Sequence, residues 1–382
     1  MAESAGSATY LSRLISGYYK DAAIGCPERV EEREFGVGTF ERKILYRHLA
    51  FANAEGLRKY LVEKAPAYVS YSTAYYRFPG RRPMENKEWK GSELVFDLDV
   101  TDMKLGCQAN HQRSWVCENC FSEIKMETIK LIEDFLVPDF GFSREEIKVN
   151  FSGNRGYHVH VKDKSVLGLG PGERKQISDY ISGAGIEVGD FFPTIGMKGV
   201  RLVGPTLDDM GWKGKIAKSF ISNLEKGVDA LCALGIERKT AANLYRKRAL
   251  ISMGIKNGNW DMVYIKNKAE FWERILLNQS IAQGDRIDKN VTIDRAHLIR
   301  MPNTLHGGSG LVAMDVPAEK LDGFDPMKDA IAFRKGELKV RAKLPYKLFM
   351  GGEEFGPYGD VDVELPIYAA VYLHLKGLAY II

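Results

Sequence analysis

The sequence predicts a mixed α/β protein of the α+β class, in which both ends of the chain form one body around a helical insertion. Alternating apolar residues indicate strands at 93–100 and 147–161. Apolar residues at helical spacing indicate helices at about 54–63, 121–136 and 171–182. Residues 205–285 are mainly helical in pattern. We therefore expect a core of residues 1–204 and 286–382 and an inserted helical subdomain over 205–285.

Composition is that of a soluble globular protein with a sizeable core. The chain has 382 residues, of which 45% are hydrophobic and 27% are charged. The first 20 residues lack the basic leader and apolar run of a signal peptide. The apolar C-terminal end is interrupted by His374 and Lys376 and is shorter than the roughly 20 residues of a membrane span. We expect a core helix and a terminal strand there, and no membrane partner.

Charge is nearly balanced, with a net charge of +4 that does not by itself indicate nucleic-acid binding. Residues 205–285 hold 13 Lys and Arg against 9 Asp and Glu, which accounts for the whole excess. Basic residues crowd one helical stretch there: Arg238, Lys239, Arg246, Lys247 and Arg248. A solvated helix face is the favoured interpretation, and contact with a nucleic-acid backbone is the alternative.

Two carboxylates lie two residues apart in an apolar segment, Glu93 to Val100. Side chains alternate along a strand, so Asp97 and Asp99 share one face. Neighbouring ionised carboxylates repel each other, and a hard divalent cation such as Mg²⁺ or Mn²⁺ relieves this repulsion. A metal site and a solvated strand end are about equally consistent with this motif, which some glycosyltransferases also carry.

A third acid, Asp294, ends a segment, residues 289–294, that alternates like a further strand. If this strand lay beside the first, three carboxylates would converge, and three can hold the two cations of phosphoryl or nucleotidyl transfer. The alternative is an acid that enters a turn or caps a helix.

Four soft ligands follow within fourteen residues. Cys107, His111, Cys117 and Cys120 have the spacing C-x3-H-x5-C-x2-C. Three thiolates and one imidazole complete a closed tetrahedral zinc site and leave no position for a substrate. We expect a structural zinc at about residues 105–121. The two remaining cysteines, Cys26 and Cys232, are expected to be ordinary thiols.

Two glycine-rich segments combine cations with histidines. Residues 150–161 contain Ser152, Arg155 and His158 around two glycines, and residues 300–311 contain Arg300 and His306. Tight glycine turns bring backbone amides close to a ligand, and arginine binds phosphate oxygens through its fork of donors. A plain β-hairpin with a surface arginine also fits the first segment.

Together, in this order, these motifs resemble the small catalytic subunit of archaeal and eukaryotic DNA primase, nearer the archaeal form. The resemblance covers roughly residues 30–320 and rests on the acid pair, the zinc knuckle, the SGxRGxH turn, the later Asp and the R-x-P-x-S-L-H-G segment. Two positions depart from it: Asn154 stands where eukaryotic members carry a second Arg, and Thr304 replaces the usual Ser. Arg33, Glu34, Phe35 and Arg47 form a weaker match.

The resemblance implies a primase core with an RRM-like sheet, a zinc knuckle and a helical subdomain. It implies catalytic Mg²⁺ or Mn²⁺ ligands at Asp97, Asp99 and Asp294. It also implies nucleotide contacts, at Ser152, Arg155, His158, Arg300 and His306.

The activity implied is template-dependent nucleotidyl transfer that makes short primers on single-stranded DNA from NTPs or dNTPs. The partners implied are a large iron-sulfur subunit in a heterodimer, and a replication polymerase and helicase. Localisation would be cytoplasmic and nucleoid-associated in an archaeon, which is favoured, or nuclear in a eukaryote. A non-catalytic zinc-bearing nucleic-acid module and a two-metal nuclease are the alternatives.

Overall fold

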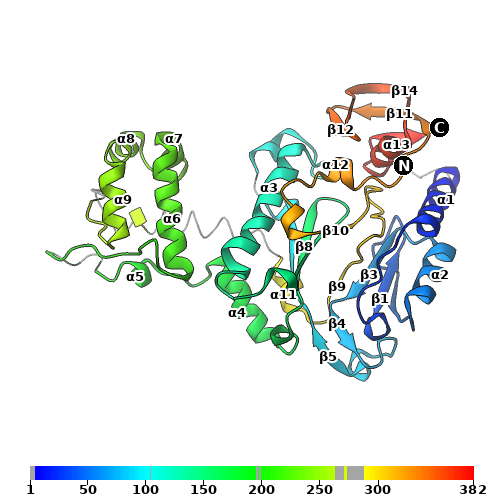
Figure 1. Ribbon diagram of the computed structural model, residues 1–382. Coiled ribbons are helices and arrows are strands. Elements are labelled where there is room, and N and C mark those ends of the chain that lie inside the picture. Colours follow the sequence, from blue (N-terminus) through cyan, green and yellow to red (C-terminus); the bar gives the residue numbers. More distant parts are fainter. Residues whose placement is uncertain (1–4, 104, 195–196, 198, 263–270, 273–287) are drawn as a thin grey trace. The chain divides into compact units, whose positions relative to one another are not determined.

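The computed structural model describes residues 5–103, 105–194, 197, 199–262, 271–272 and 288–382 (Figure 1). The chain forms two compact units, each described by itself below. Unit 1 comprises Met1–Ile129, Ser143–Lys175 and Asp288–Ile382, and unit 2 comprises Lys130–Phe142 and Gln176–Ile287. Parts of the predicted insertion, residues 263–270 and 273–285, lie outside the described residues. No described helix has the length and apolar character needed to cross a membrane.

Unit 1 contains a four-stranded antiparallel sheet in the order β10-β7-β8-β6. Its strands are β6 (Leu94–Asp99), β7 (Ile147–Phe151), β8 (Gly156–Val161) and β10 (Met314–Val316). The predicted strands at 93–100 and 147–161 are thereby confirmed. Directly opposite residues share a face, so the register Asp97↔His158↔Asn150↔Asp315 crosses the whole sheet on one side.

A second antiparallel sheet of unit 1 has the order β2-β1-β3-β9. Its strands are β1 (Phe35–Gly38), β2 (Tyr46–Leu49), β3 (Tyr68–Ser72) and β9 (Leu298–Arg300). Helices α1 (Ala5–Asp21) and α2 (Ala54–Lys64) supply Ile15, Tyr19, Leu57 and Leu61 to the apolar core of this sheet. Burial of such side chains stabilises the sheet by about 25 cal/mol per Å² of apolar surface.

The remaining elements of unit 1 complete it along the chain. Helices α3 (Glu118–Lys130) and α4 (Pro171–Ser182) begin in it, and the hairpin β4 (Ala74–Tyr76) and β5 (Trp89–Ser92) precedes β6. The short helices α11 (Lys289–Ile293) and α12 (Pro326–Asp329) follow later. The C-terminal part contains the sheet β14-β11-β15 and the hairpin β12-β13. Its elements are β11 (Glu337–Leu344), β12 (Leu348–Met350), β13 (Glu353–Phe355), β14 (Tyr358–Pro366), α13 (Ile367–Leu375) and β15 (Ala379–Ile381). The expected core helix and terminal strand are confirmed.

Unit 2 is helical in its described part. Its helices are α5 (Val188–Phe191), α6 (Gly211–Lys226), α7 (Val228–Ala233), α8 (Arg238–Arg246) and α9 (Arg248–Lys256), and Leu131–Leu136 forms a π-helical segment. Aromatic side chains form its core, with the rings of Trp260 and Trp272 4.7 Å apart and nearly perpendicular. On α8, Arg238 pairs with Asp229 at 3.0 Å on the exposed surface.

One expected strand is wrong. Residues 289–293 form the helix α11, because Asp288 caps its first turn by accepting a hydrogen bond from the Asn290 amide at 2.9 Å. Five residues are too few for the alternation of apolar residues to separate a strand from a helical turn. Asp294 follows the last residue of this helix.

Candidate active site and zinc knuckle

Asp97 and Asp99 project from the same face at the end of β6. Phe96 and Leu98, which alternate with them, are buried on the opposite face, and this fixes the orientation of the two acids. Burial, together with the charges of Asp99 and Asp288, raises the pKa of Asp97 to about 7. His158, opposite Asp97 in the register, has its Nε2 atom 3.6 Å from the Asp97 Oδ1 atom. The ionised form of Asp97 is therefore unfavourable here, and a bound cation would stabilise it.

Asp99 is bound by two neighbours. The Arg155 Nε atom lies 2.7 Å from its Oδ1 atom, and the Thr101 amide and hydroxyl donate to the same oxygen at 2.8 and 2.7 Å. Arg155 reaches it because β8 pairs with β6 and places Gly156 opposite Asp99. The predicted phosphate-binding arginine and the predicted metal ligand thus lie in direct contact.

Asp294 follows α11, which is joined to β6 by a hydrogen bond from the Asp288 amide to the Asp97 carbonyl at 3.0 Å. Its carboxylate accepts from the Ala296 amide at 2.9 Å and lies 3.8 Å from His297 Nδ1. The nearby imidazole of His297 lowers the pKa of Asp294, and the hydrogen bond from the Ala296 amide adds to this effect.

Among the described residues, the zinc-knuckle residues converge as a group of potential metal ligands, whereas Asp97, Asp99 and Asp294 do not form such a group. They repel each other, and Asp99 and Asp294 each have a cationic or imidazole partner instead. His297 acts electrostatically on both acids. It partly offsets the raised pKa of Asp97, and it contributes to the lowered pKa of Asp294.

The two glycine-rich segments pack against each other. Gly153 has φ +83°, and a Cβ atom placed on it would lie 2.8 Å from the His306 Cβ atom. The Ser309 hydroxyl also donates to the Gly153 carbonyl. Ser152 closes the first turn, because its hydroxyl accepts from the Gly156 amide at 3.2 Å. Glycine is required at position 153 by both its conformation and this close approach.

Arg300 and His158 each have a buried polar atom whose hydrogen bonding is unsatisfied within the described structure. Among the described residues, Arg300 Nε and His158 Nδ1 are buried polar atoms that lack a hydrogen-bond partner. Burial lowers the pKa of Arg300 to about 10 and lowers the pKa values of His158 and His306 well below 6.5. Both histidines are therefore neutral at pH 7. Unpaired buried donors are costly, and an anionic ligand would satisfy them.

Sequence reasoning missed a buried network at the start of β6. Glu93 lies fully buried, accepting from Arg33 and from the Tyr75 hydroxyl at 2.9 Å, while its second oxygen lies 2.8 Å from His160 Nδ1. Although burial raises it, the charges of Arg33 and His160 hold the pKa of Glu93 far below 4.5. His160 therefore supports the sheet rather than facing a ligand with His158. Only the weak match at Arg33 hinted at this network.

Glu34 and Arg47, the rest of that weaker match, also have a defined place. The buried Glu34 carboxylate lies 2.7 Å from Arg47 Nε and 2.9 Å from Lys87 Nζ. Arg47 in turn donates to the Ala296 carbonyl at 3.1 Å, beside Asp294. Glu34 thus anchors an arginine next to the third acid.

The four zinc-knuckle residues converge. One ligand atom from each of Cys107, His111, Cys117 and Cys120 lies within 4.8 Å of the others. The Cys120 sulfur is 3.6 Å from each of the other two sulfurs and 3.5 Å from His111 Nε2. A zinc tetrahedron with sulfur bonds of 2.3 Å has edges of about 3.8 Å, so the set fits this ion. His111 Nδ1 lies 3.1 Å from the Gln112 carbonyl, the partner that orients a metal-binding imidazole.

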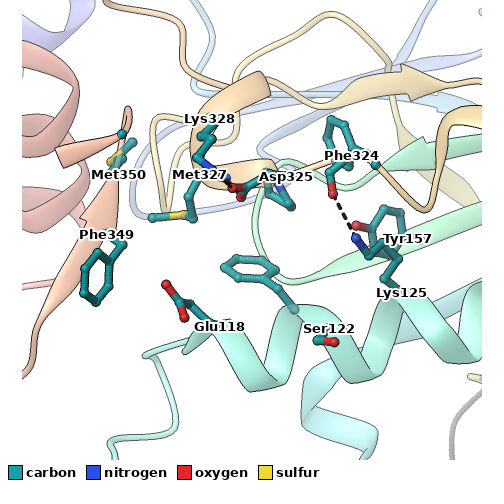
Figure 2. A pocket seen from close by; sticks show the side chains of 14 residues that line it. Glu118, Ser122, Lys125, Tyr157, Phe324, Asp325, Met327, Lys328, Phe349 and Met350 are labelled. Atoms are coloured by element: carbon teal, nitrogen blue, oxygen red, sulfur yellow. Dashed lines mark hydrogen bonds and ion pairs between the residues drawn. The ribbon is translucent and has the colours of Figure 1, made fainter. Parts of the chain in front are cut away.

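Two cavities lie on opposite faces of the β10-β7-β8-β6 sheet. One of about 710 Å³ includes Asn150, His160 and Asp315, which share the face of Asp97. The other, of about 440 Å³, lies between α3, α12 and β12, and Figure 2 shows Tyr157 and Phe324 among its lining. Tyr157 faces away from Asp97, because it pairs with Leu98 in the register. The second cavity is therefore separate from the carboxylates.

Comparison with known proteins agrees with this geometry. A family model described as DNA primase small subunit matches residues 96–316. The chain belongs to the DNA primase small-subunit family. Proteins named DNA primase small subunit PriS are similar along nearly the whole chain. The one from Methanothrix thermoacetophila is 34% identical over 98% of each chain. The one from Thermoplasma acidophilum is 34% identical over 96% of this chain and 98% of its own. The one from Cenarchaeum symbiosum is 32% identical over 93% of each.

Membership confirms the resemblance and makes the chain an enzyme, a nucleotidyltransferase of the DNA primase type. The mixed α/β class is likewise confirmed. Its family implies a DNA template and a primase complex. The matched segment contains the three acids, the zinc knuckle and both glycine-rich segments. These relatives are archaeal, the form that the motifs favour.

Proposed function

We propose that this chain extends and initiates primers by two-metal nucleotidyl transfer, with Asp97, Asp99 and Asp294 as ligands of Mg²⁺ or Mn²⁺. The observation that carries the proposal is the juxtaposition of two adjacent carboxylates with Arg155 and two interlocked glycine turns. When bound, the cations would activate a primer 3′-hydroxyl and neutralise charge on the phosphates.

Within this proposal, the residues of the glycine turns hold the nucleotide. Arg300 Nε and His158 Nδ1 are buried without a hydrogen-bond partner among the described residues, and a phosphate oxygen would supply one. The His306 Nδ1 atom accepts from the Gly308 amide at 3.1 Å, so its proton resides on Nε2 and can be donated to a phosphate oxygen. Ser152 holds the first turn closed and keeps Arg155 in reach of the site.

Cations held by the acids would change the partner of Arg155. Its guanidinium neutralises Asp99, and a divalent cation at Asp99 would compete for the same oxygens. Arg155 would then be released toward the triphosphate that arrives with the cation.

The zinc of the proposal is structural and belongs to Cys107, His111, Cys117 and Cys120. The partners we propose are single-stranded DNA, NTPs or dNTPs, and a large iron-sulfur subunit in a heterodimer, with a replication polymerase and helicase nearby. Three of the five cysteines belong to the zinc knuckle. The other two, Cys26 and Cys232, lie far apart in sequence and cannot supply the four cysteines of an iron-sulfur cluster.

The decisive experiment is primer synthesis on single-stranded DNA by the purified chain, supplied separately with ribonucleotides and with deoxyribonucleotides. We expect short products that depend on Mg²⁺ or Mn²⁺. Degradation of the template without synthesis would support the two-metal nuclease instead. Zinc-dependent template binding without either reaction would support a passive binding module.

A further inference from the structure

A lysine far from the recognised motifs projects into the candidate site from the C-terminal end of the chain. Lys376 follows the last residue of α13, and its amide donates to the Tyr372 carbonyl at 3.0 Å. Gly377, with φ +72°, ends the helix immediately afterwards. The backbone that carries Lys376 is therefore fixed by a helix end rather than by a loose loop.

Helix α13 packs directly on the second glycine-rich segment. A Cβ atom placed on Gly310 would lie 2.8 Å from the Val371 Cγ1 atom and 3.5 Å from Leu375 Cδ1. Val371 and Tyr372 are buried, so the helix cannot shift without disturbing the core. This contact sets the distance between the helix end and the segment that contains His306.

The ammonium group of Lys376 meets the first glycine turn. Its Nζ atom donates to the Asn154 Oδ1 atom at 2.7 Å, and the side chain is half-buried. In the described part of the chain, no carboxylate lies within salt-bridge distance of this ammonium group. The ammonium group also lies over the Tyr372 ring, 5.3 Å from its centroid, but neither this ring nor a neutral amide oxygen supplies a counter-charge for a half-buried cation.

The electrostatics place Lys376 among the groups assigned to the nucleotide. Burial and the charge of Arg155 lower the pKa of Lys376 to about 8, while Asp99 raises it. Lys376 in turn contributes to the lowered pKa of His306. One ammonium group is thus within electrostatic reach of Arg155, His306 and Asp99.

We propose that Lys376 is a nucleotide-binding residue whose ammonium group contacts a phosphate of the incoming nucleotide. This inference rests on the proposed function of the same site. A lysine binds phosphate as a point charge and needs no bidentate geometry. The Asn154 amide holds the ammonium group in place until the more strongly attracting phosphate arrives.

The test combines removal of the cation with its relocation. Lys376→Ala should raise the KM for the incoming nucleotide roughly ten- to a hundredfold in extension of an annealed primer, with little change in kcat. Lys376→Arg should remain near wild type. The double variant Asn154→Arg with Lys376→Ala moves the cation to the other residue of the 2.7 Å contact, and should recover most of the lost affinity.

The matched control is Lys339→Ala, which removes an equally charged, exposed side chain from β11. It should leave the KM unchanged. Equilibrium dialysis with radiolabelled ATP and MgCl₂ should show the same order of affinities without any turnover. If wild type neither primes nor extends, the proposed function fails, and the dialysis still decides the role of Lys376.

An unchanged nucleotide affinity in Lys376→Ala would overturn the inference. The inference would also be overturned if Lys376→Ala lost both nucleotide affinity and thermal stability, and the double variant with Asn154→Arg recovered neither. A purely structural lysine predicts that second pattern, because its loss would act through α13 rather than through charge at the site.

Discussion

The zinc knuckle and the carboxylate site of unit 1 differ in how completely the chain assembles them. Four soft ligands of the knuckle already converge with tetrahedral spacing. The three acids stay apart, with Asp99 bound to Arg155 and Asp294 beside His297. Neutral thiols and imidazole do not repel each other, whereas ionised carboxylates do. A structural site can therefore be pre-formed, while a catalytic one is completed by its cations.

Two carboxylates along one chain segment, just before β6 and within it, show the same contrast between a completed and an incomplete charge arrangement. Glu93 and Asp97 are four residues apart, and their pKa values shift in opposite directions. Glu93 is paired with Arg33 and His160, while Asp97 faces other acids. The charge of Glu93 is neutralised for stability, whereas Asp97 has, among the described residues, only His158 nearby at 3.6 Å and is left without a full counter-charge for function.

The largest expected effect tests the incomplete site. Asp97→Asn or Asp99→Asn should lower nucleotide incorporation about a thousandfold or more, because each loses several kcal/mol of metal-mediated stabilisation. Thermal stability of Asp97→Asn should stay equal or rise, since like-charge repulsion is relieved. Rates from primer extension and melting curves measure both quantities.

Asp102→Asn is the matched control, because Asp102 raises the pKa of Asp97 through its charge but is not a proposed ligand. It should change the rate far less. Near-normal activity in Asp294→Asn would remove that residue from the site, and would leave the two acids of β6 as the whole set.

The second prediction concerns the zinc knuckle, where a substitution should reduce stability far more than activity. Cys117→Ser should lower the free energy of unfolding by more than about 4 kcal/mol, since it removes a ligand of a folding metal. Turnover per folded molecule should change little. Elemental analysis should find about one zinc per wild-type chain. Cys232→Ser is the control, and a native protein without zinc would contradict the assignment.

The third prediction addresses the neutralised acid. Glu93→Gln should lower the free energy of unfolding by about 3–5 kcal/mol, because Arg33 would be left buried without its counter-charge. The exposed pair of Arg341 and Asp360 is the control, and Asp360→Asn should have a much smaller effect. Equal effects in urea titrations would show that burial of the pair is unimportant.

Acid should destabilise the protein through the same residue. The folded-state pKa of Glu93 lies below its ordinary value of 4.5, so its contribution is fully present above that pH and is lost as pH falls below it. Stability measured from pH 6 down to pH 3 should therefore fall more steeply in wild type than in Glu93→Gln. Parallel curves would contradict this linkage.

The smallest expected effect distinguishes the nucleotide from the template. Arg155→Ala and His306→Ala should each weaken nucleotide binding by about 1.5–3 kcal/mol, roughly ten- to a hundredfold, because the lost contacts are to charged phosphate. Template contacts are spread over many phosphates and should barely change. Fluorescence anisotropy with single-stranded DNA and dialysis with nucleotide compare the two. If nucleotide binding and single-stranded DNA binding weakened equally, the glycine turns would be structural hairpins and not a nucleotide site.

Local sequence determined the elements and the ligand types. Alternation fixed which face of β6 carries Asp97 and Asp99, and the spacing of Cys107, His111, Cys117 and Cys120 fixed the zinc set, because both depend on residues close in the chain. The same short-range view failed at 289–294, where a capping acid made a helix from an alternating segment.

Tertiary structure alone decided which charges meet. Nothing near Glu93 in the sequence indicates Arg33, and nothing near Asn154 indicates Lys376, which lies 222 residues away. Such pairs form because strand pairing and helix packing bring distant segments within a few ångströms, where burial strengthens each charge. The sequence thus named the chemistry of the site, and the fold decided which of its charges are neutralised and which remain available to a ligand.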